Sequence, residues 1–161
     1  MHHVVKLAVI LCLTLNTSLA LAEKTTGAGA KKLLADTAGR AKISVDRNTG
    51  LARFIRLEPT SSLGPLKPQL KSKSKSKIVD TSGSSSLSFL REYGSAFGIA
   101  DVDSELTLVR TTQDKQGSSR SIFKQNYKGL PVFAGELRTH FNSNGEMIAV
   151  NGNFLADIKV I

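Results

Sequence analysis

Histidine and cysteine, which most often bind metals or act as nucleophiles, are scarce in this chain of 161 residues. The chain has three His and one Cys, and three of these four, His2, His3 and Cys12, lie among the first 22 residues. His140, the remaining one, lies on the polar side of a predicted strand, where we expect an exposed or pairing role. The sequence contains no H-E-x-x-H pair for zinc hydrolysis and no G-x-S-x-G elbow for a serine nucleophile. We therefore expect no catalytic residue, metal site or cofactor.

One acidic cluster has the spacing of a cation-binding loop. Asp101, Asp103 and Glu105 form D-x-D-x-E, whose carboxylates could bind calcium. The cluster lacks the glycine and the distal glutamate of an EF-hand, and acidic loop residues are more often simply solvated. We expect solvated side chains here. The G-A-G-A-K-K stretch at 27–32 lacks the preceding strand and the spacing of a phosphate-binding loop.

The first 22 residues have the parts of a secretory signal peptide. His2, His3 and Lys6 precede an apolar core at 7–15, and Ala20 and Ala22 supply the small residues that a signal peptidase reads. This core is far shorter than the roughly 20 residues that span a bilayer as a helix. We expect cleavage after Ala22, a secreted or periplasmic product, and no stable membrane anchor.

The net charge of +9 would suit a nucleic-acid-binding protein, but its location argues otherwise. Residues 23–80 contain 13 basic and 5 acidic side chains, whereas residues 81–161 contain 8 of each. Lysine alternates with serine at 71–77, without aromatic residues to stack on bases. This run is either a polycation for phosphate or anionic lipid, or a solvated spacer that proteases can cut. We favour the spacer and expect no nucleic-acid partner.

Composition divides residues 23–80 into three parts. Residues 23–41 are rich in Ala, Gly, Thr and Lys, which predicts a flexible arm with at most a short helix. Residues 42–57 alternate apolar and polar side chains around the turn signal N-T-G at 48–50, which predicts a short β-hairpin. Residues 58–80 contain three prolines and the Lys/Ser run, which predicts a disordered basic linker.

Residues 81–161 have the pattern of an α+β domain, with one amphipathic helix packed on a small antiparallel sheet of about four strands. Ser84 to Ser86 offer N-caps, and Leu87, Leu90, Tyr93, Ala96 and Phe97 then recur at helical spacing until Gly98. Strands are predicted at 106–109, 119–127, 136–141 and 147–150. Asn144-Gly145 predicts a two-residue hairpin turn, and Gly129 with Pro131 predicts a bend or a sheet edge.

A dense motif lies within this domain. The stretch F-K-Q-N-Y-K-G-L-P-V-F-A-G-E-L at 123–137 closely resembles the F-x-Q-x-Y-x-G-x-P-V-F-G-G-E-L signature of the fungalysin/thermolysin propeptide (FTP) domain. Ala134 replaces the usual Gly, a departure that could tighten the bend. The matching positions, including the trailing N-G, are Phe123, Gln125, Tyr127, Gly129, Pro131, Val132, Phe133, Gly135, Glu136, Leu137, Asn151 and Gly152.

The resemblance implies the N-terminal prosegment of a secreted, bacterial thermolysin-like zinc metallopeptidase precursor, a zymogen. Such a propeptide is a folding assistant and temporary inhibitor, and its partner is the catalytic domain, in cis or in trans. In family precursors a second propeptide module and a zinc peptidase domain follow; this chain contains neither, so we read it as a truncated precursor without enzymatic activity.

The alternative is a stand-alone secreted binding or inhibitor protein whose basic linker attaches it to an anionic surface. Phe133 and Phe154 are the candidate partner contacts, with a place in the domain's own core as the alternative reading for each. Phe123 and Phe141 are expected to belong to that core.

Overall fold

The computed structural model describes residues 27–58 and 75–158, and for residues 75–80 it describes the backbone alone. The predicted signal peptide, with Ala20 and Ala22, and most of the predicted linker lie outside the described residues. The elements in chain order are α1 (Ala28–Asp36), β1 (Lys42–Val45), β2 (Ala52–Arg56), α2 (Lys75–Tyr93), the 3₁₀ helix η1 (Gly94–Phe97), α3 (Val102–Glu105), β3 (Leu106–Gln113), β4 (Ser119–Tyr127), β5 (Leu130–Phe141) and β6 (Met147–Asn153).

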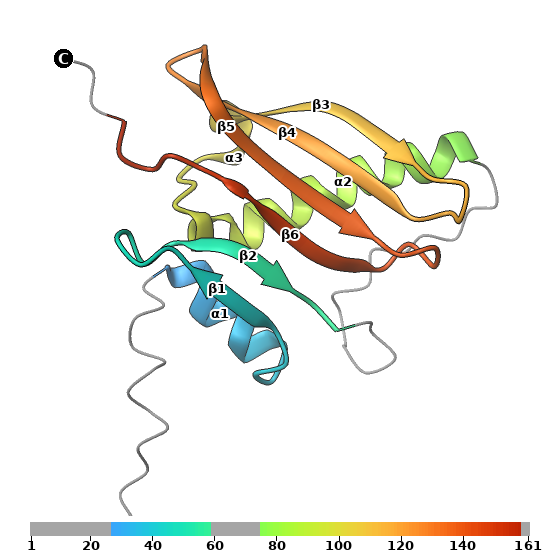
Figure 1. Cartoon of the computed structure of the whole chain (residues 1–161), viewed down its shortest axis with the longest axis horizontal. Coiled ribbons are helices and arrows are strands. Elements are labelled where there is room, and N and C mark those ends of the chain that lie inside the picture. Colours follow the sequence, from blue (N-terminus) through green and yellow to red (C-terminus); the bar gives the residue numbers. More distant parts are fainter. Residues whose placement is uncertain (1–26, 59–74, 159–161) are drawn as a thin grey trace, which may run out of the picture.

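The six strands form one antiparallel sheet in the order β1-β2-β6-β5-β4-β3. The last strand, β6, lies between β2 and β5, because Val150 pairs with Ile55 on one side and with Thr139 on the other. Figure 1 shows α2 running behind the sheet, so the helices cover one face and leave the other open. The predicted α+β class is confirmed. The predicted hairpin at 42–57 forms, but it extends this sheet instead of standing apart from it.

The hydrophobic core lies between the sheet and the helices. Phe123, Leu137 and Phe141 from the sheet share one buried cluster with Leu90 and Phe97 from the helical layer. This confirms that Phe123 and Phe141 belong to the core of the domain. The predicted strands are also present, although β3, β5 and β6 are longer than the sequence indicated.

Helix α2 begins at Lys75, well before the serines predicted to cap it. Ser82 and Ser86 are fully buried; the Ser82 hydroxyl bonds that of Ser119 at 2.8 Å. The Ser86 hydroxyl donates to the Ser82 carbonyl and so accepts from Thr139 Oγ1 at 2.6 Å. The capping prediction was wrong, because the serines lie inside the helix and not at its start. The small side chains of Ser82 and Ser86 instead let the helix lie close to β4 and β5. The linker prediction was wrong for residues 75–80, which are helical.

The helical layer ends where the sequence predicted. The turns of η1 continue α2 to Phe97, and Gly98 follows in the left-handed conformation with φ of 88°. A Cβ on Gly98 would lie 2.6 Å from the Ala156 side chain. Both the conformation and the contact therefore favour glycine at this helix end.

Helix α1, at residues 28–36, is the short helix that the sequence allowed within the predicted flexible arm, but it packs on the core instead of being mobile. Leu33 is fully buried in the common core, and the Gly29 amide donates to Ser95 Oγ at 2.8 Å. A Cβ on Gly29 would lie 2.5 Å from the carbonyl oxygen of Tyr93. The glycines that suggested mobility instead allow α1 to approach η1 closely.

Polar contacts between α1 and α2 support this packing. Lys32 Nζ bonds Glu92 at 2.6 Å and Asp36 at 2.9 Å, and the Tyr93 hydroxyl donates to Asp36 at 2.8 Å. Burial and the bond to Asp36 raise the pKa of Tyr93, while the bonds from Lys32 and Tyr93 lower the pKa of Asp36.

The hairpin turns differ from the prediction. The Asn144-Gly145 turn is a longer loop closed by the Asn142 amide bonding the Glu146 carbonyl at 2.9 Å, and of the pair only Gly145 has positive φ. The two-residue turn lies instead at Lys128-Gly129, where φ is 49° and 81°. Positive φ at both positions is the geometry of a type I′ turn, which places the predicted bend between β4 and β5.

Candidate functional site

The motif residues of β5 form a wide bulge. Asn126 pairs with Pro131 and Lys124 pairs with Glu136, so residues 132–135 stand opposite Gln125 alone. Ala134 adopts a φ of 59°, the left-handed region that non-glycine residues rarely occupy. The bulge turns Phe133 away from the domain and leaves its side chain 96% exposed.

Gln125 anchors this bulge from the opposite strand. Its side chain is 2% exposed, and its amide group donates to the Leu155 carbonyl at 2.8 Å and accepts from the Leu155 amide at 2.9 Å. A Cβ on Gly135 would lie 2.7 Å from Gln125 Oε1. The motif residues Gln125 and Gly135 thus pack together and tie the bulge to the segment after β6.

The trailing N-G of the motif has its own constraints. Gly152 has a φ of 153°, and a Cβ there would overlap the carbonyl oxygen of Glu136 in β5. The neighbouring Asn151 accepts, through Oδ1, a 2.8 Å bond that His140 Nε2 donates. His140, predicted to be exposed or pairing, is therefore a pairing residue between β5 and β6.

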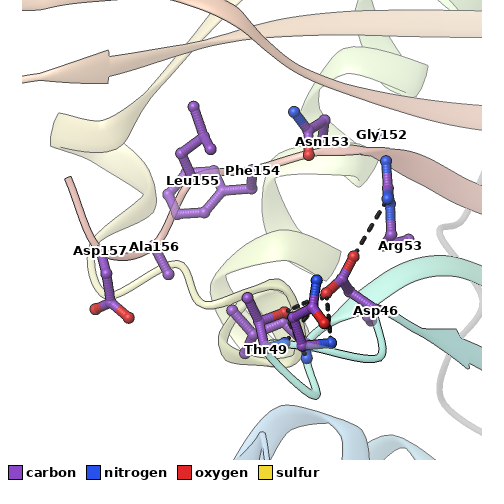
Figure 2. A pocket seen from close by; sticks show the side chains of 12 residues that line it. Asp46, Thr49, Arg53, Gly152, Asn153, Phe154, Leu155, Ala156 and Asp157 are labelled. Carbon is purple, nitrogen blue, oxygen red and sulfur yellow. Dashed lines mark hydrogen bonds and ion pairs between the residues drawn. The ribbon is translucent and has the colours of Figure 1, made fainter.

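Two shallow depressions flank the bulge and the segment after β6. One, of about 350 Å³, lies between the β1–β2 turn and residues 152–157; Figure 2 shows Asp46 and Thr49 on one side and Phe154 to Asp157 on the other. The second, of about 440 Å³, lies over Phe54, Ala134 and Arg138. Arg53, Gly152 and Asn153 line both depressions, so the two adjoin each other.

Two carboxylates at these depressions, Asp46 and Glu136, are held in the ionised form. Asp46 accepts backbone bonds from Thr49 and Asn48, which lower its pKa, and it pairs with Arg53 at 3.3 Å. The Lys124 ammonium lowers the pKa of Glu136, and Arg138 also pairs with this carboxylate. Lowered pKa values suit charge pairing and not proton transfer near neutral pH.

The structure separates the predicted motif residues into two groups. Phe123, Gln125, Gly135 and Leu137 are buried and maintain the fold. Pro131 and Phe133 are exposed, while Tyr127, Val132 and Glu136 are half-buried at the surface of the bulge region. The link between Gln125 and Leu155 was not predicted, because a side chain that bonds backbone atoms 30 residues away leaves no local sequence signal.

The two candidate partner contacts have different surroundings. Phe133 touches solvent over almost its whole side chain. Phe154 is half-buried and packs against the core cluster, beside Leu155, which is 43% exposed. Of these two side chains, Phe133 is thus the one that the domain leaves available for contact with a partner.

Each carboxylate of the D-x-D-x-E cluster already has a hydrogen-bond or ion-pair partner nearby. Asp101 caps α3 by accepting from the Asp103 amide, Glu105 accepts from the amides of Ala100 and Asp101, and Asp103 pairs with Arg91 at 2.6 Å. Among the described residues, no group of three or more metal-ligating side chains occurs. No helix within the described ranges is long and apolar enough to cross a membrane.

Comparison with known proteins bears on the motif segment. No curated protein and no solved structure was found to match the chain. A family model does match, and its range begins in α3 and ends just after β6, so it includes the bulge, Gln125 and Gly152. Residues 104–154 are thereby identified with the Fungalysin/Thermolysin Propeptide Motif, which confirms the resemblance seen in the sequence.

Proposed function

We propose that this chain is the propeptide module of a secreted thermolysin-like metallopeptidase, which assists the folding of the catalytic domain and temporarily inhibits it. The observation that carries the proposal is the exposed Phe133, which lies within the matched propeptide segment. The catalytic chemistry belongs to the partner. The role of this chain is to bind.

Phe133 has the properties of an interface anchor. A phenyl side chain that is 96% exposed contributes nothing to its own core, and burying such a side chain in a partner contributes about 1.5–3 kcal/mol. Aromatic residues that fill a pocket on the partner commonly dominate the binding energy of an interface.

The bulge presents this ring in a preorganised form. Gln125 and Gly135 pack against each other at its base, and Gln125 bonds both backbone groups of Leu155. A fixed loop has less conformational entropy to lose on binding. The depression beside Ala134 and Arg138 adds room for a side chain of the partner.

A substitution of Phe133 tests the proposal. We expect the full chain to inhibit a secreted thermolysin-like peptidase or to raise its refolding yield. Phe133→Ala should weaken that effect at least tenfold, equivalent to about 1.4 kcal/mol of binding, without changing the unfolding midpoint.

Val109→Ala is the matched control. Val109 is 54% exposed on β3, an edge strand of the sheet, and its truncation should leave inhibition and refolding yield unchanged. The proposal fails if the full chain affects neither activity nor refolding of peptidases of this class, or if Phe133→Ala equals the wild type.

The proposal includes export. If the leader is removed as the sequence indicates, N-terminal sequencing of the protein recovered from the periplasm or medium will begin at Glu23. Replacing both Ala20 and Ala22 by Arg should leave the precursor uncleaved, because the signal peptidase requires small residues at these positions.

A further inference from the structure

The strands place a basic surface on the side of the sheet opposite the helices. Ser119 and Thr139 bond α2, and since side chains alternate along a strand, their neighbours in sequence point to the uncovered side. We call this side the open face. Its charged side chains are Lys42, Arg56, Arg110, Arg120, Lys124, Glu136 and Arg138.

The strand register aligns these cations across the sheet. Arg110 is opposite Ile122, which is opposite Arg138. Arg120 is opposite His140, and the same row continues through Ala149 to Arg56 in β2. Neighbouring strands lie about 4.8 Å apart. The cations therefore form one basic field that extends across the sheet, from its edge strand β1 to the opposite edge strand β3.

Little negative charge compensates this field. Glu136 is the only acidic residue within the six strands, and it already pairs with Lys124 at 3.0 Å and with Arg138. Arg56, Arg110 and Arg120 are exposed and have no ion pair within the described residues. Other carboxylates pair away from this face, as Glu92 does with Lys32 and Asp103 with Arg91.

We propose that the open face is a docking surface for an acidic protein surface. Four of its six cations are arginines, whose planar guanidinium groups suit carboxylates. The exposed aromatic residues Phe54 and Phe133 lie at the end of the face beside the bulge, whereas its middle carries Ile122, Arg138 and His140 and so has no row of rings for stacking nucleic-acid bases. Charge complementarity therefore selects a protein rich in Asp and Glu.

The open face is continuous with the bulge that carries Phe133. One depression is lined by Phe54, Ala134, Glu136 and Arg138, which joins the middle of the face to the base of the bulge. A partner that buries Phe133 could therefore place acidic side chains over Arg138 and its neighbours. The inference rests on the proposed function only where it has one partner contact Phe133 and the open face at the same time. The basic charge of the open face does not depend on the proposed function.

Binding of poly-L-glutamate to the full chain tests the proposal without any peptidase. The variant Arg110→Glu/Arg120→Glu reverses two charges on the open face. The control Lys31→Glu/Lys115→Glu makes the same change in net charge at two exposed residues, one on α1 and one in the β3–β4 turn. Both variants keep the Lys/Ser run at 71–77, so any binding to that run is common to them.

We expect the open-face variant to bind poly-L-glutamate at least tenfold more weakly than the wild type, and the control variant to stay within threefold. Added salt should weaken wild-type binding, since exposed charges are screened. Equal losses in the two variants, or no loss in either, would overturn the proposal. Tighter binding of single-stranded DNA or phosphatidylglycerol vesicles, lost selectively in the open-face variant, would also overturn it in favour of those ligands.

This outcome is separable from that of the proposed function. Failure of the chain to affect a metallopeptidase would leave a selective loss of poly-L-glutamate binding intact. Conversely, an inhibitor whose open-face variant binds poly-L-glutamate like the control would keep the propeptide role and lose the acidic docking surface.

Discussion

Gly152 is the motif residue with the least freedom to change. Its φ of 153° disfavours other residues, and a Cβ would overlap the Glu136 carbonyl oxygen. A backbone carbonyl in a paired strand cannot move aside as a flexible side chain can. Gly152→Ala should therefore lower the free energy of unfolding by about 3 kcal/mol, the sum of overpacking and backbone strain. Urea denaturation followed by circular dichroism measures this change.

Gly129→Ala separates the two contributions. Gly129 also has positive φ, but a Cβ there would meet no atom within 4 Å, so we expect a loss of about 1 kcal/mol from strain alone. Equal losses at Gly129 and Gly152 would contradict the close approach of β5 and β6.

Gln125 should matter for order in the segment after β6. Gln125→Ala removes both bonds to the Leu155 backbone, and the loss of buried hydrogen bonds should cost about 1–3 kcal/mol. Hydrogen exchange at the Leu155 amide should become faster, and the loss of protection, expressed as a free energy, should be of the same size. Gln116→Ala, at an exposed turn residue, provides the control, and unchanged exchange at Leu155 in Gln125→Ala would count against the anchor.

Among the elements, α1 differs most from what its composition suggested, because it is packed on the core and not part of a flexible arm. Leu33 is fully buried, and Leu33→Ala should destabilise the protein by about 2–4 kcal/mol through lost burial and the remaining cavity. Lys31→Ala on the exposed side of the same helix should change stability by less than about 0.5 kcal/mol. If α1 were a mobile arm, thermal unfolding of the two variants would be indistinguishable.

The pairing of β4 with β5 should depend on pH through Glu136. Its pKa is lowered from the ordinary value of 4.5, chiefly by Lys124. A carboxylate with a lowered pKa in the folded state stabilises the protein above its unfolded pKa, and the contribution disappears as pH falls through the lower folded value. Glu136→Gln should therefore lower stability at pH 7 by up to about 1 kcal/mol and have no such effect at pH 2.

A double-mutant cycle checks the cause. In a Lys124→Met background, Glu136→Gln should have a smaller effect at pH 7, because the main partner of the carboxylate is already absent. Urea titrations at both pH values give the four free energies. An undiminished effect in that background would assign the stabilisation to another group.

Local patterns predicted the elements better than they predicted their contacts. Alternation identified the strands, and the spacing from Leu87 to Phe97 identified the end of the helical layer. Ser84 to Ser86 were read as caps, whereas Ser86 bonds β5, and Ser82, which the pattern did not single out, bonds β4. Glycines near α1 suggested mobility although they allow close packing against η1. In each case a contact with a residue distant in sequence decides the outcome.

The candidate site shows the same division. The motif indicated which residues belong together, and Phe133 was among the proposed contacts. The bulge itself depends on the register that leaves residues 132–135 opposite Gln125, which no short pattern specifies. Similarly, residues 81–161 have balanced charge along the sequence, yet the alternation of the strands places four of their eight basic side chains on one face.

For the molecule as a whole, the sheet order makes the N-terminal hairpin part of one cooperative unit. Ile55 in β2 is fully buried and pairs with Val150, which in turn pairs with Thr139 in β5. Ile55→Ala should thus lower the free energy of global unfolding by about 3 kcal/mol. The slowest-exchanging amides of β4 and β5 should lose the same protection as those of β2. Arg47→Ala, in the exposed β1–β2 turn, should leave both sets unchanged. If the hairpin instead unfolded by itself, Ile55→Ala would accelerate exchange in β1 and β2 alone, and the sheet would have to be regarded as two units.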